Sequence, residues 1–171
     1  MKYLYSIFPL STVEVKQEVK EERVETLKGF YLRLLDEKVS NKFVDVKASE
    51  IFGDVIGKCM LDVPLNQVTK KMVRDSVKCV IRNAEKMFIE FDNAFKKCLK
   101  TYKETKNFDT FLQCIEGKVS DETVKKVVKV CAVASNKNIG DFYECTAGGF
   151  RVIALFAKKY ELEALRHALR R

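Results

Sequence analysis

Four cations recur at every fourth residue in the middle of the chain: Arg74, Lys78, Arg82 and Lys86. On an α-helix this spacing places all four on one side, about 6 Å apart along the axis. Such a row can contact successive phosphates of a nucleic acid. Like charges at this spacing cost an isolated helix about 0.2 to 0.5 kcal/mol per pair, which favours an anionic partner. A solvated, lysine-rich helix face is the alternative interpretation.

The same side of the predicted helix carries further cations. The candidate nucleic-acid-binding residues are Lys71, Arg74, Lys78, Arg82, Lys86, Lys96, Lys100 and Lys103. Asp75, Glu85 and Asp92 interrupt this set, so the surface is mixed with a positive excess. A candidate secondary basic patch comprises Lys125, Lys126, Lys129, Arg166, Arg170 and Arg171. Cations also stabilise the C-terminal end of a helix, which accounts for part of this second group.

The six cysteines are Cys59, Cys79, Cys98, Cys114, Cys131 and Cys145. They contain no Cys-x-x-Cys pair, and His167 is the only histidine, so we expect no zinc site and no metal ligands. We find no export signal, which favours buried free thiols over disulfides. Disulfides of the kind found inside hyperthermophiles are the alternative, consistent with 24 Lys and only three Gln.

No set of residues predicts catalysis. His167 lies beside arginines near the end of the chain, where a surface role is more common than general-base chemistry. Cys145 precedes two glycines at 148–149, but it lacks a second histidine to activate it, so an inert thiol or a disulfide partner is preferred. Glycine-rich phosphate loops, nucleophile elbows, HExxH and EF-hand patterns are missing. We therefore expect a protein without enzymatic activity and without a cofactor.

One long helix, from about Leu65 to Glu104, is expected to position the cations. Its apolar residues alternate four and three positions apart, which keeps them on one side for about seven turns. This predicted seam consists of Val77, Ile81, Ala84, Phe88, Phe91, Phe95, Cys98 and Tyr102. Three phenylalanines in such positions suit the wide core of a helical bundle better than a two-stranded coiled coil.

Two further helices are expected before the long one. The Ser-x-x-Glu spacing of Ser11 and Glu14 is typical of a capping box, and apolar residues follow at helical intervals, which predicts a helix from about Thr12 to Lys38. A short second helix is expected between residues 40 and 57, with Gly57 at its end. A strand that begins at residues 43–46 is the alternative for its first part.

The remaining helices follow the long one. Asn107 and Ser120 are the predicted N-caps of a fourth and a fifth helix, and Gly117 is expected to close the fourth. Residues 136–140 are expected to form a loop. The last stretch is expected to form one or two helices, in which the glycines at 148–149 either break the helix or permit a close crossing.

Composition supports one compact domain, residues 1–171. The chain is 47% hydrophobic and 33% charged, with only two prolines and seven glycines, which favours long helices. We expect an all-α bundle of about five to seven helices, preceded by a short apolar N-terminal arm or strand at residues 1–10. That arm is too short to span a membrane, and we expect it to pack on the body or on a neighbouring subunit.

The formal net charge of +8 favours an anionic partner. We expect a cytoplasmic protein, without membrane association, that binds the backbone of DNA or RNA without reading specific bases, as a homo-oligomer or a subunit of a larger nucleoprotein assembly. A short helix-turn-helix within residues 107–136 is only loosely suggested. The alternative is a protein-interaction or scaffold module that presents a helical face or the arm to a partner, with its basic side against an acidic surface.

Overall fold

The computed structural model describes residues 25–39 and 46–169. Within these residues the chain forms helices, together with one isolated antiparallel bridge between Thr26 and Pro64. The helices are α2 (Leu27–Lys38), α3 (Ala48–Cys59), the 3-10 helix η2 (Leu65–Gln67), α4 (Lys70–Thr105), α5 (Phe108–Lys118), α6 (Glu122–Ala134), α7 (Ile139–Lys159) and α8 (Glu161–Leu169). The predicted all-α bundle with one long helix is confirmed.

Some predictions lie outside the described residues. They concern the apolar arm at 1–10, the capping box of Ser11 and Glu14, the first helix at 12–24, the alternative strand at 43–45, and the cations Arg170 and Arg171. These predictions stay as they were made.

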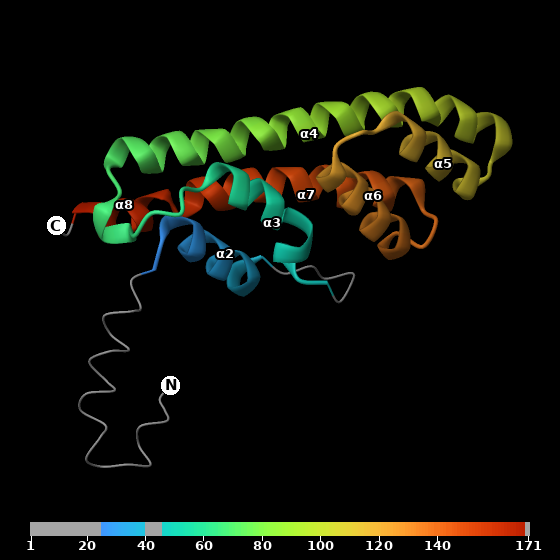
Figure 1. Cartoon of the computed structure of the whole chain (residues 1–171). Coiled ribbons are helices and arrows are strands. Elements are labelled where there is room, and N and C mark those ends of the chain that lie inside the picture. Colours follow the sequence, from blue (N-terminus) through green and yellow to red (C-terminus); the bar gives the residue numbers. More distant parts are fainter. Residues whose placement is uncertain (1–24, 40–45, 170–171) are drawn as a thin grey trace, which may run out of the picture.

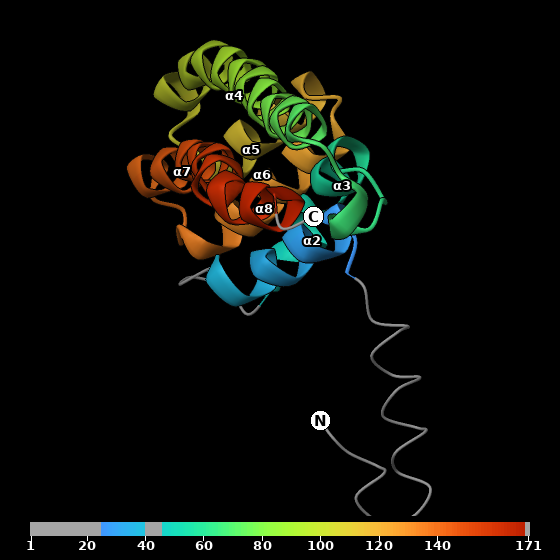
Figure 2. The ribbon, with the colours of Figure 1, turned by 90° about the vertical axis from the view of Figure 1, so that its left-hand side faces the viewer.

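The long helix α4 runs the length of the bundle along one side (Figure 1). Helices α7 and α8 follow one another beneath it, and α4 packs against both. Helices α5 and α6 lie toward one end of α4, while α2 and α3 lie toward the other (Figure 1). The view along the bundle shows α4 at its edge, with the other helices on one side of it (Figure 2). The opposite side of α4 is therefore free to face solvent.

The helix predicted to run unbroken from 12 to 38 is wrong at residues 25–26. Thr26 has an extended backbone and caps α2, which begins at Leu27. Two backbone hydrogen bonds of 2.9 Å join residues 25–27 to residues 63–65, so the segment that enters α2 pairs with another extended segment. Backbone groups used in that pairing are not available for helical hydrogen bonds.

The predicted start of the long helix at Leu65 is also wrong, because α4 begins at Lys70. Pro64 takes part in the bridge with Thr26, and only one 3-10 turn follows it. The chain is then extended until Thr69, whose Oγ1 accepts a hydrogen bond from the Met72 amide at 3.1 Å. A threonine in this position satisfies an amide that has no partner inside the helix.

Several other predicted ends shift by one or two residues. Gly57 lies inside α3, which continues to Cys59, and α5 continues one residue beyond Gly117. The predicted cap Asn107 is correct, since its side chain accepts from the Thr110 amide at 3.0 Å. The cap of α6 is Asp121 and not the predicted Ser120, whose amide and hydroxyl instead donate to Glu90 on α4.

Helix α7 passes through the glycine pair at 148–149 without a break. Asn138 caps it by accepting from the Asp141 amide at 2.9 Å, so the predicted loop ends two residues early and Gly140 is helical. At Gly149 an added Cβ would lie 3.6 Å from Phe52 and 3.7 Å from Val127, which places this residue where α7 crosses α3 and α6. The alternative of a break at these glycines is therefore wrong, since the chain breaks later, at Tyr160. The alternative of a close crossing stays a prediction, because an added Cβ at Gly149 would make only ordinary contacts.

The buried side of α4 is centred slightly differently from the predicted seam. Four seam residues, Val77, Ala84, Phe91 and Cys98, are buried as predicted. The residues between them that complete the buried stripe are Val80, Met87 and Ala94. The predicted seam residues Ile81, Phe88, Phe95 and Tyr102 are only partly buried and pack on the flank. The centre of the stripe combines small residues such as Ala84 and Ala94 with the fully buried ring of Phe91, and the other aromatic rings cover the sides.

All six cysteines form disulfides, so the expectation of free thiols is wrong. The pairs are Cys59–Cys79, Cys98–Cys114 and Cys131–Cys145, with Cα–Cα distances of 5.5, 5.7 and 5.6 Å. They join α3 to α4, α4 to α5, and α6 to α7. Consecutive helices that pack side by side bring cysteines from both into the separation that a disulfide requires.

Candidate functional site

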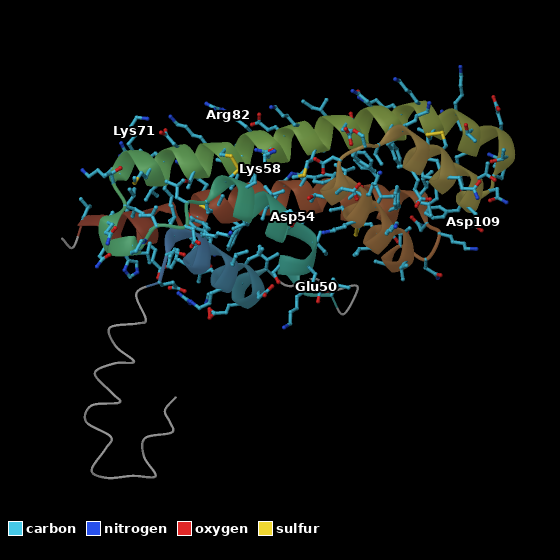
Figure 3. All side chains as sticks on the ribbon, viewed as in Figure 1. Glu50, Asp54, Lys58, Lys71, Arg82 and Asp109 are labelled. Carbon is cyan, nitrogen blue, oxygen red and sulfur yellow. A yellow bond between two sulfur atoms is a disulfide. The ribbon has the colours of Figure 1, made fainter. Side chains whose placement is uncertain are left out.

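The eight cations predicted for nucleic-acid binding all lie on the exposed side of α4. We call this set, Lys71, Arg74, Lys78, Arg82, Lys86, Lys96, Lys100 and Lys103, the α4 cationic face. Lys71 and Arg82 project from the outer side of the helix, away from the rest of the bundle (Figure 3). Burial of the opposite side fixes the rotation of α4, so the core determines where these charges point.

Two members of the α4 cationic face each form an ion pair with an aspartate one helical turn away. Lys71 Nζ lies 2.6 Å from an Asp75 carboxylate oxygen, and Lys96 Nζ lies 2.9 Å from an Asp92 oxygen. The hydrogen bond from Lys71 lowers the pKa of Asp75, and the positive charges of Lys78 and Arg82 lower that pKa further. Lys78 and Arg82 thus act on Asp75 through their charge, without forming an ion pair with it.

Arg74, Lys78 and Arg82 form the strongest part of the α4 cationic face. Each is exposed, and none forms an ion pair or a side-chain hydrogen bond within the described part of the chain. Asp75 interacts electrostatically with Lys78 and Arg82, but its ion pair is with Lys71. Three cations on successive turns of one continuous helix can each contact an anionic oxygen of one extended partner.

Asp92 connects the second ion pair to the neighbouring helix. Its carboxylate accepts a hydrogen bond of 3.0 Å from the Tyr143 hydroxyl on α7. The hydrogen bond from Lys96 lowers the pKa of Asp92, and the bond from Tyr143 adds to this effect. The pKa of the Tyr143 hydroxyl is raised, first by burial and then by Asp92. This carboxylate is therefore a structural contact between α4 and α7, and it reduces the charge that Lys96 offers to a partner.

Lys86 lies beside a polar depression of about 340 Å³ between α3, α4 and the start of α6. Lys58 on α3 enters the same depression, and its Nζ donates to Asn83 Oδ1 at 3.2 Å. The Glu90 carboxylate accepts from the amides of Ser120 and Asp121 at 3.1 and 3.0 Å. The acidic oxygens here are used to hold the start of α6 against α4, so the depression has a structural explanation.

The four described members of the candidate secondary basic patch do not form one surface. Lys125 lies 3.5 Å from Glu122 and Lys126 lies 3.4 Å from Asp54 on α3, so both cations of α6 already have acidic neighbours. Lys129 is exposed on the same helix. Arg166 is on α8, and Figure 1 shows α6 and α8 toward opposite ends of α7.

Two residues beside the α4 cationic face were not predicted. Ile89 is 56% exposed. It lies on the same side of α4 as the cations, two turns after Arg82 and two turns before Lys96. Arg151 is exposed on α7 and lines the same shallow groove as Ile89. The signal for Ile89 was present in the sequence, because an isoleucine stands among charged residues on the polar side of the helix. The sequence contains no signal that α7, which carries Arg151, packs beside Ile89.

The two residues considered for catalysis, Cys145 and His167, both make contacts that stabilise the fold. Cys145 is bonded to Cys131 and does not titrate. His167 is half-buried, and its ring packs against Phe30 with 5.6 Å between ring centres. These contacts explain both side chains through packing.

No helix within residues 25–39 and 46–169 is both long and apolar enough to cross a membrane. The same residues contain no group of three or more His, Cys, Asp or Glu side chains arranged to hold a metal ion. Comparisons of the chain with protein-family models, with curated proteins and with solved structures find no match.

Proposed function

We propose that this protein binds the phosphate backbone of nucleic acid through the α4 cationic face. It acts without enzymatic activity and without strong sequence preference, as a subunit of a larger nucleoprotein assembly. The observation that carries the proposal is the group of Arg74, Lys78 and Arg82, which are exposed, evenly spaced and not ion-paired within the described part of the chain. Phosphate contacts of this kind supply affinity without reading bases.

The fold supports the proposal by presenting α4 as one continuous helix with an outward side. Its 36 residues extend over about 54 Å, by the usual rise of about 1.5 Å per residue. The disulfides at Cys79 and Cys98 hold α4 to its neighbours on either side in the sequence. A rigid charged helix loses little conformational entropy when it binds, which favours affinity for a long, regular anion.

A cytoplasmic location is part of the same proposal. Disulfides persist in oxidising compartments and also in intracellular proteins of hyperthermophiles. The three disulfides and the nucleic-acid partner are compatible in a cytoplasm of the second kind. The high lysine and low glutamine content is consistent with that setting.

The test is fluorescence anisotropy with labelled single- and double-stranded DNA and RNA across a salt series. The variant Arg74→Glu/Lys78→Glu/Arg82→Glu should bind at least about 100-fold more weakly, because each lost charged contact is worth about 1 kcal/mol or more. The slope of log affinity against log salt should fall in magnitude by about 2 to 3, since three phosphate contacts no longer release counterions.

The matched control is Lys125→Glu/Lys126→Glu/Lys129→Glu on α6, which changes the net charge by the same amount. Two of these lysines already have acidic neighbours, so we expect a loss of less than about tenfold. Equal losses for the two triple variants would mean that total charge alone determines binding. Absence of binding by the unchanged protein at low salt would reject the proposed function.

A second candidate function is a protein-interaction module, which exposed apolar side chains on α7 and α8 favour. Leu155 is 61% exposed and Leu162 is 59% exposed. A chain that forms an oligomer through them should dissociate when both are changed to serine, as measured by light scattering on size-exclusion chromatography. Deletion of residues 1–10 tests the other interaction surface that the sequence suggests.

A further inference from the structure

An apolar groove lies beside the α4 cationic face, between α4 and α7. Its volume is about 430 Å³, and its apolar lining comes from Ala84, Phe88, Ile89, Ala147, Phe150 and Ala154. Glu85 and Arg151 are the charged residues that line it. The groove is open because alanines line it on both helices, and larger side chains in their place would fill it.

The most exposed apolar residue of this groove is Ile89, at 56%. It lies seven residues after Arg82 and seven before Lys96, so each cation is about 10 Å away along the helix axis. An isoleucine in this position contributes little to the core and leaves apolar surface in water. A ligand with an apolar surface would cover it.

The charges around the groove indicate what kind of ligand that is. Arg82 and Lys96 on α4 and Arg151 on α7 give the surroundings a positive excess. The acids are Glu85, which lines the groove, and Asp92, which forms an ion pair with Lys96. The occupant must therefore be anionic along its length and apolar on a flat face. A single strand of nucleic acid offers both, because its bases are not covered by a complementary strand. A duplex offers its phosphates but keeps its base faces stacked inside.

We infer that the α4–α7 groove takes an unpaired base, so that the α4 cationic face prefers single-stranded nucleic acid to duplex. This inference rests on the proposed function, because the phosphates on either side of the base are held by the cations of α4. Packing of a base against Ile89 and Phe88 is tolerant of base identity, since every base has a flat apolar face.

The test compares two labelled strands of about 12 nucleotides, a length within the usual site sizes of single-strand binders. One is oligothymidine, and the other has the same phosphates but abasic sugars throughout. We expect oligothymidine to bind about tenfold more tightly than the abasic strand, and more tightly than a duplex of equal length. The variant Ile89→Ser should reduce the tenfold difference to less than about threefold while leaving the affinity for the abasic strand unchanged.

The control variant is Val133→Ser, which changes another exposed apolar residue, 73% exposed on α6. This variant should keep the full tenfold difference in affinity between oligothymidine and the abasic strand. Circular dichroism should show both serine variants folded, because both side chains are largely in solvent.

Three results would overturn the inference, and they are distinguishable. Equal affinity for oligothymidine and the abasic strand would leave backbone binding intact but reject a base in the groove. An unchanged difference in Ile89→Ser would place the base elsewhere on the protein. Failure of both strands to bind, with Ile89-dependent binding of an oligoglutamate peptide instead, would reject the proposed function as well and indicate a protein partner.

Discussion

Helix α4 is held to its neighbours in two different ways. Disulfides join it to α3 and α5, at Cys59–Cys79 and Cys98–Cys114. Against α7 it relies on side-chain packing, in which the ring of Phe91 lies 5.9 Å from that of Phe142 and 6.2 Å from that of Phe150. The groove that contains Ile89 is on this second, noncovalent contact. The difference shows that disulfides constrain α4 against its neighbours in sequence, while the contact with α7 depends on aromatic packing and on the hydrogen bond from Tyr143 to Asp92.

The largest effect is expected at the noncovalent contact. Phe91 is fully buried and packs against rings from both α4 and α7, so Phe91→Ala should lower the free energy of unfolding by about 3 to 5 kcal/mol. Phe91→Leu, which keeps most of the volume, should cost less than about 1.5 kcal/mol. Urea unfolding followed by circular dichroism measures both. A loss below about 1 kcal/mol for the alanine variant would mean that the disulfides, and not the aromatic cluster, hold α4.

The covalent contact is tested by Cys59→Ala/Cys79→Ala. The disulfide closes a segment of 20 residues, for which the chain-entropy model gives about 3 kcal/mol of stabilisation. We expect this loss in urea unfolding, together with unchanged nucleic-acid affinity at 25 °C, because the cations on α4 remain in place. Alanine avoids a buried hydroxyl at position 59, where the cysteine is 6% exposed. A large drop in affinity would show that the binding surface depends on this disulfide.

The smallest effect is expected at the hydrogen bond between Tyr143 and Asp92. Tyr143→Phe should cost about 1 kcal/mol at pH 7. Because the folded protein lowers the pKa of Asp92, the stabilisation from this carboxylate is present above the ordinary pKa of about 3.9 and is lost as pH falls below it. The difference in stability between the variant and the unchanged protein should therefore shrink as the pH falls from about 4 through the lowered pKa of Asp92. A constant difference across that range would mean that the hydrogen bond does not depend on the charge of Asp92.

Helical periodicity was sufficient to predict the class of fold and the approximate position of α4. The errors at its start and at the start of α2 have one cause, the pairing of residues 25–27 with residues 63–65. That contact joins segments far apart in sequence, so no local pattern contained it. The cap of α6 was misplaced for a similar reason, because Glu90, 30 residues earlier, binds the amide of Ser120.

The candidate site was predictable where it depended on one helix. The α4 cationic face follows from spacing alone, and all eight members are exposed. The seam was shifted toward Met87 and away from Phe88 because residue size does not indicate which side of a wide apolar stripe faces the core. The neutralisation of Lys126 by Asp54 and the position of Arg151 depend on packing between helices, which the sequence pattern does not reveal.

The disulfides join the cysteines strictly in sequence order: first to second, third to fourth, and fifth to sixth. Six cysteines allow 15 pairings, and this one contains only short loops, of 20, 16 and 14 residues. Short loops close at a lower entropic cost than long ones, so oxidation of an unfolded chain favours these partners over distant ones. No loop encloses another cysteine. Each bond is therefore able to form as soon as its own pair of helices has been synthesised, without waiting for the rest of the chain.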